Sequence, residues 1–91
     1  MKSAYELAME RLEKQSPTAT LTDAQKAEIA EIDSVCRSKI AEKEVFLNDQ
    51  ILKARAAQQA GEVADLEKQL AFEIRRIREN AEAKKDKVRG R

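Results

Sequence analysis

The chain has 91 residues, of which 38% are charged and 3% aromatic, and its formal net charge is +1. This composition is typical of a long helix or coiled coil rather than of a globule with a thick core. The near-zero net charge excludes a global field that would attract nucleic acid or an acidic substrate. We therefore expect one small helical domain, which gains part of its stability by oligomerising.

The N-terminal segment predicts a helix over residues 3–15. Ser3 followed by Glu6 is an S-x-x-E capping box, in which each side chain satisfies a backbone N–H group at the helix start. Pro17 disfavours helical geometry in the residue before it, and threonines follow it. We therefore expect a loop over residues 16–21.

A second capping box, Thr22 with Gln25, predicts the start of a long helix over residues 22–60. A third helix is expected over residues 62–88, followed by a frayed basic tail at 89–91. In both long helices, apolar residues recur every eleven residues, in the sets Ile29, Ile40 and Ile51, Cys36 and Leu47, Leu66, Ile77 and Val88, Val63 and Ile74, and Leu70 and Ala81. Eleven residues make three helical turns, so each apolar stripe runs almost straight along its helix.

The shape of the molecule depends on Gly61. If the helix continued through it, the last two helices would form one rod about 100 Å long. Glycine is, however, the preferred residue just past a helix C-terminus, and the two stripes match when the chain turns at Gly61. We therefore favour a turn there, which would place Lys85 near Ile40. The sequence leaves open whether the next helix begins at Glu62 or only after Asp65.

This turn leaves the start of the long helix, residues 27–33, without a partner. We expect the N-terminal helix to turn back over that surface and to cover it with its apolar residues Tyr5, Ala8 and Leu12. The predicted fold is all-α, a three-helix antiparallel arrangement. In it, a long central helix forms a helical hairpin with the C-terminal helix and is packed at its other end by a short N-terminal helix.

Four large apolar residues lie off the main stripes, namely Phe46, Phe72, Val35 and Val45. Solvent-facing phenylalanines are uncommon on a highly charged helix. These four residues are the candidate interaction surface, and we expect at least one of the two phenylalanines to be covered by a second copy of the chain, most simply across a two-fold axis. The alternative is that either ring folds over the seam of its own hairpin. A homodimer is favoured, and the identity of any other protein partner is left open.

The residue inventory predicts no catalytic residues, no cofactor site and no metal site. The chain contains no histidine and one cysteine, Cys36, whose place on an apolar stripe predicts a buried structural thiol. The acidic cluster of Glu28, Glu31 and Asp33 is best explained as a solvated helix face, because no glycine-containing ligand loop accompanies it. We therefore expect a protein that is not an enzyme.

The C-terminal segment is the one basic region of the chain. Its cations are candidates for a phosphate-binding stripe, and they are Arg75, Arg76, Arg78, Lys84, Lys85, Lys87, Arg89 and Arg91. Three acidic residues interrupt this stripe, and no aromatic residues are interleaved to stack on bases. We therefore favour a solvated helix face and keep non-specific nucleic-acid binding through residues 75–91 as the alternative function.

The opening KSAYELAMERLEK, followed by LTDAQKAEIAEID, resembles a group of short bacterial helical, coiled-coil-like proteins with no known activity. They share the order of a capped N-terminal helix, a Pro/Thr loop and a charged helical hairpin. The resemblance implies a bacterial, cytoplasmic setting. No apolar run approaches the roughly 20 residues of a membrane-spanning helix, so we expect no membrane association. The function predicted from the sequence is that of a small structural or protein-interaction hairpin that self-associates.

Overall fold

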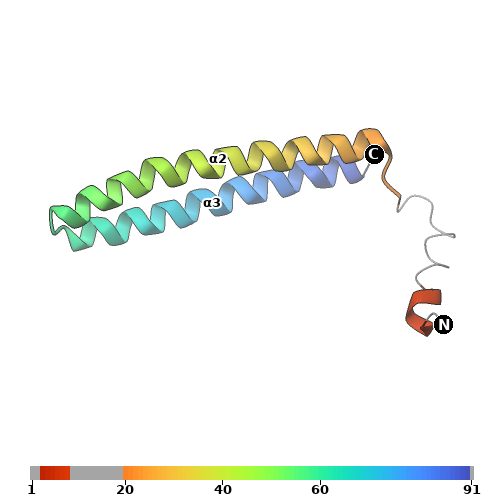
Figure 1. Ribbon diagram of the computed structural model, residues 1–91, viewed down its shortest axis with the longest axis horizontal. Helices are drawn as coiled ribbons and strands as arrows, with labels where there is room; N and C mark the ends of the chain where they lie inside the picture. Colours follow the sequence, from red (N-terminus) through yellow and green to blue (C-terminus); the bar gives the residue numbers. More distant parts are fainter. Residues whose placement is uncertain (1–2, 9–19, 91) are drawn as a thin grey trace.

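The computed structural model describes residues 3–8 and 20–90, and these residues form helices and no strand (Figure 1). Residues 4–8 are a short helix. They are followed by α2, Asp23–Ala56, and α3, Ala60–Arg89, which lie side by side and antiparallel. The longest dimension of the molecule is 61 Å, which confirms the helical hairpin and excludes the single rod. The predictions for residues 9–19 and for Arg91 lie outside the described residues.

The start of α2 is built as the sequence predicted. The backbone N–H of Gln25 donates to Thr22 Oγ1 at 3.1 Å, and the N–H of Thr22 donates to Gln25 Oε1 at 2.8 Å, which is a complete capping box. Gln25 has a second role, since its side-chain amide donates to the carbonyl oxygen of Val88 at 2.9 Å. The capping residue therefore joins the first turn of α2 to the last turn of α3.

The chain turns at residues 57–59, and the middle residue of this turn, Gln58, stands three residues before Gly61. Gln58 has a left-handed backbone, with φ of 55°. Its N–H donates to the carbonyl of Arg55, and the N–H of the next residue donates to the carbonyl of Ala54. This pair of bonds is the Schellman motif, in which glycine normally occupies the left-handed position. The predicted turn at Gly61 was therefore wrong, and that glycine lies in the first turn of α3.

The earlier turn changes which residues face each other. Lys85 was predicted to lie near Ile40, but its ammonium group is 2.8 Å from the carboxylate of Asp33, seven residues or about two helical turns away. A turn that moves by three residues shifts every partner by about six, which accounts for most of this difference. The new register lets α3 cover α2 along its whole length, and burial of that extra apolar surface outweighs the roughly 1–2 kcal/mol of left-handed strain at Gln58.

This register also explains why the N-terminal helix does not pack on the hairpin. The end of α3 lies beside the start of α2 (Figure 1), so the surface at residues 27–33 is already occupied. Residues 3–8 are all exposed, including Tyr5 and Ala8. The short helix itself is present, with the N–H of Glu6 bonded to Ser3 Oγ at 3.2 Å. The predicted packing of Tyr5 and Ala8 on α2 was wrong, and Leu12 lies outside the described residues.

The core is a single layer of side chains along the seam between α2 and α3. Every residue of the eleven-residue stripes is buried or half-buried, as the spacing predicted. The residues with the least exposed surface are four stripe members, Leu47, Ile51, Ala81 and Val88, together with Ala54, which lies outside the eleven-residue sets. Because the seam is one layer deep, it is open to solvent along both edges.

Candidate interaction surface

The four apolar residues that the sequence singled out are exposed in the hairpin. Phe46 on α2 is 61% exposed and Phe72 on α3 is 57% exposed, and both Val35 and Val45 are exposed as well. Neither phenylalanine ring therefore folds over the seam of its own chain, which was the alternative to coverage by a second copy. The sequence analysis missed Leu52, which is also exposed. Leu52 follows Ile51 and lies off the eleven-residue stripes, and this position in the sequence could have predicted its exposure.

Two of these residues belong to one continuous strip along α2, which consists of Val35, Lys39, Glu42 and Phe46. The four stand at intervals of four, three and four residues, and eleven residues complete three turns, so they share one side of the helix. Val35 and Lys39 line one depression, while Glu42 and Phe46 line the next. We call this set the α2 strip.

A groove runs between α2 and α3 at the Val35 end of the strip. It has a volume of about 160 Å³. Its apolar lining comes from both helices and consists of Ile32, Val35, Cys36, Ile77 and Ala81. Its polar lining residues are Glu31, Lys39, Asn80 and Lys84. We call this depression the seam groove.

Cys36 illustrates how the seam groove arises. It was predicted to be a buried structural thiol, but it is only half-buried and lines the groove. One of the residues that line the groove from α3 is Ala81, whose methyl group leaves more of the thiol uncovered than a larger apolar side chain would. An eleven-residue stripe predicts which residues of each helix face the seam. It does not predict whether small side chains of the two helices lie at the same level of the seam and leave a groove there.

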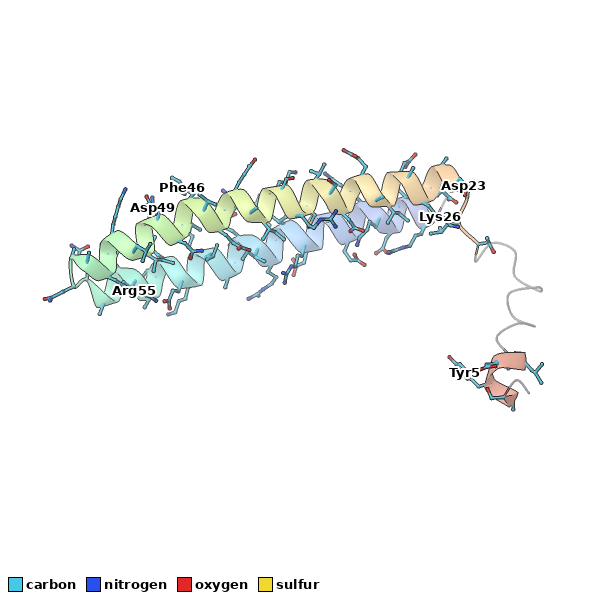
Figure 2. All side chains as sticks on the ribbon, in the orientation of Figure 1. Tyr5, Asp23, Lys26, Phe46, Asp49 and Arg55 are labelled. Atoms are coloured by element: carbon cyan, nitrogen blue, oxygen red, sulfur yellow. The ribbon has the colours of Figure 1, made fainter. Side chains whose placement is uncertain are left out.

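The other end of the strip surrounds Phe46. Its ring, together with Glu42, Val45 and Asp49, lines a shallow depression on the outer surface of α2. Figure 2 shows Phe46 and Asp49 along the side of α2 that is turned away from α3. Phe46 therefore projects from the hairpin, with an acidic residue on the preceding and on the following helical turn.

The strongest electrostatic feature of the described residues is an ion-pair cluster near the open end of the hairpin. Lys85 Nζ lies 2.8 Å from Asp33 Oδ1 and 2.9 Å from Glu82 Oε2. Hydrogen bonds from Lys85 lower the pKa of both carboxyl groups, and the bonds to Asp33 and Glu82 in turn raise the pKa of Lys85 against the opposing effect of burial. This cluster connects α2 to α3 and has a structural role.

The same cluster bears on the basic C-terminal segment. Lys85 is half-buried and engaged by two carboxylates, while Arg89 pairs with Asp86 at 2.9 Å and with Glu82 at 3.6 Å. Two of the eight candidate phosphate-binding cations are therefore neutralised within the hairpin. Five others are exposed, namely Arg75, Arg76, Arg78, Lys84 and Lys87, and Arg91 lies outside the described residues.

Three further observations complete the description. In the part of the chain that the structure describes, no three Cys, Asp or Glu side chains are grouped so as to hold a metal ion. No helix among residues 3–8 and 20–90 is long and apolar enough to cross a membrane. Comparisons of the chain with protein-family models, with curated proteins and with solved structures find no match.

Proposed function

We propose that this protein is a small structural hairpin that acts by binding other protein surfaces, and that it first binds a second copy of itself. The observation that carries this proposal is the exposure of two phenylalanine rings on a hairpin whose core is one residue deep. Exposed aromatic residues are enriched at interfaces between proteins. A domain of this size with a thin core gains much of its stability by association.

The chemistry of the described residues supports a non-catalytic role. The chain contains no histidine. Among the described residues, the groups with shifted pKa values are Asp33, Glu82 and Lys85: Lys85 pairs with Asp33 across the two helices and with Glu82 within α3, and none of the three lines the seam groove. The resemblance noted above and the single cysteine support a bacterial cytoplasmic setting, which is part of the proposal.

The oligomeric state of the full chain tests this function. Light scattering coupled to gel filtration should give twice the monomer mass of 10.3 kDa at micromolar concentration, with little change between low and moderate salt, because apolar contacts are not screened. Replacing both Phe46 and Phe72 with Ala should shift the protein towards the monomer mass. A wild-type chain that stays monomeric at the highest soluble concentration would contradict the proposal.

A further inference from the structure

The seam groove has the size and lining of a site for one aromatic ring. An enclosed cavity of about 150 Å³ lined by apolar side chains binds benzene, and the seam groove, which is partly open to solvent, has about 160 Å³ and an apolar lining of Ile, Val, Cys and Ala side chains. A half-buried thiol such as that of Cys36 is also a favourable neighbour for an aromatic ring.

Phe46 is the ring that the α2 strip presents for such a site. It cannot enter the groove of its own chain, because it stands eleven residues from Val35 on the same helix, a separation of about 16 Å along the axis. The same separation allows it to enter the groove of another copy. The groove and the ring occupy the two ends of one strip, so two strips that lie antiparallel bring each ring over the other's groove.

The charges of the strip favour this antiparallel alignment. If Phe46 lies opposite Val35 of the partner, the two residues between them are also paired, and Lys39 faces Glu42 of the partner at two symmetric places. Both side chains are exposed, and neither belongs to an ion pair among the described residues. Opposite charges at such positions set the register and orientation of paired helices.

The charges around the groove are complementary to the charges around the Phe46 ring of a second copy. Lys39 and Lys84 stand at the rim, while Glu42 and Asp49 stand beside the ring that would enter. Glu31 is the one acidic lining residue, and the alignment places it opposite the uncharged Gln50 of the partner.

We infer that two copies of this chain pack through antiparallel α2 strips across a two-fold axis between Lys39 and Glu42, so that each Phe46 fills the seam groove of the partner. This inference rests on the self-association proposed above and names its surface. Such an interface is isologous, since the same ring and groove are used twice. It assigns no role to Phe72, which is then available for a different partner.

A designed disulfide tests the alignment. In a Phe46→Cys variant, the new thiol should reach Cys36 of the partner, and mild oxidation should produce a covalent dimer in which peptide mapping finds the link between positions 36 and 46. Within one chain these positions are ten residues apart on a helix, about 15 Å, and a disulfide needs Cα atoms less than 7 Å apart. A link between these two positions is therefore intermolecular. The Phe46→Cys, Cys36→Ser double variant is the control and should not cross-link.

The outcomes separate the two proposals. A link between two copies of position 46, or the absence of the link from 36 to 46 in a variant that is dimeric by mass, would overturn the inference but not the self-association. Phe46→Ala should weaken dimerisation at least about 100-fold, because two buried rings are lost and each is worth about tenfold or more. Phe72→Ala should leave it unchanged. The reverse pattern would also overturn the inference.

Charge exchange provides a second test that leaves both rings in place. Lys39→Glu and Glu42→Lys should each weaken the dimer by up to about tenfold, since each introduces like charges at two exposed places. The double variant should restore wild-type affinity, which a purely structural role of either residue does not predict. If the double variant is as weak as the single ones, the antiparallel register is wrong.

Discussion

Leu47 and Leu52 form a matched pair of leucines on α2, one inside the seam and one outside it. Leu47 is 1% exposed and Leu52 is 64% exposed. Replacement of a buried Leu by Ala destabilises a protein by 2–5 kcal/mol, and the loss is smaller where the surroundings can close around the space. The seam is open at both edges, so we expect about 2–3 kcal/mol for Leu47→Ala. For Leu52→Ala we expect less than about 0.5 kcal/mol.

Urea unfolding followed by circular dichroism at the helical band measures both values. With a denaturant dependence of about 1 kcal/mol per molar urea for a chain of this size, Leu47→Ala should lower the midpoint by roughly 2–3 M and Leu52→Ala by less than about 0.5 M. All samples need the same protein concentration, because the stability of a self-associating chain depends on it. If the two variants unfold at the same midpoint, the seam does not run through Leu47 and the hairpin register is wrong.

Three further predictions concern the turn, the ion-pair cluster and the basic segment. Gln58→Gly and Gly61→Ala should each raise the urea midpoint, by an amount equivalent to about 0.5–1 kcal/mol, because one relieves left-handed strain and the other removes a glycine from a helix. If Gly61→Ala instead destabilises the chain, the turn lies at that glycine. The lowered pKa of Asp33 stabilises the fold above its ordinary value of 3.8, and this stability is lost as the pH falls through the lowered value; Asp33→Asn should flatten the fall of the midpoint measured between pH 5 and pH 2. A fall as steep as that of wild type would mean that Asp33 is not paired in solution. The five exposed cations of the basic segment can be replaced with Gln while the ion-pair cluster around Lys85 stays intact. We expect this variant and the wild type to be retained equally on a DNA column at moderate salt. A loss of retention that depends steeply on salt would favour the nucleic-acid alternative. The residues to replace are Arg75, Arg76, Arg78, Lys84 and Lys87.

The fold class was predictable because it depends on periodicity summed over many residues. A stripe repeated every eleven residues predicts which side of each helix is buried, and the capping box at Thr22 predicts where α2 begins. The exposure of Phe46 and Phe72 followed from the same pattern, since both lie off the stripes. These features depend only on the spacing of residues along the chain, which can be read from the sequence.

The turn was not predictable from local preference. Glycine at a left-handed helix end is favoured by about 1 kcal/mol, and this preference pointed to Gly61. The chain instead places Gln58 in that conformation, because an earlier turn extends the seam to Gln25 and Val88. The free energy gained by burying apolar surface along a whole helix outweighs the strain of one left-handed residue. Sequence reasoning applied to one position at a time cannot compare these two free energies.

Two other differences follow from that turn. The register moved by about two helical turns, and the surface reserved for the N-terminal helix was taken by the end of α3. The seam groove is also a property of the register, since Cys36 of α2 and Ala81 of α3 line it together. The apolar lining of the seam groove could be predicted only once it was known which residues of α3 face which residues of α2.

The most direct test of the hairpin is the distance between its two open ends. Spin labels on Lys26→Cys and Lys87→Cys, both exposed positions, can be introduced in a Cys36→Ser background and diluted with unlabelled protein, so that pulsed electron paramagnetic resonance reports the distance within one chain. A hairpin closed from Gln25 to Val88 predicts a distance below about 25 Å, which allows for two labels on helices 8–10 Å apart. A distance near 90 Å, the length of a continuous helix between these positions, would contradict the account.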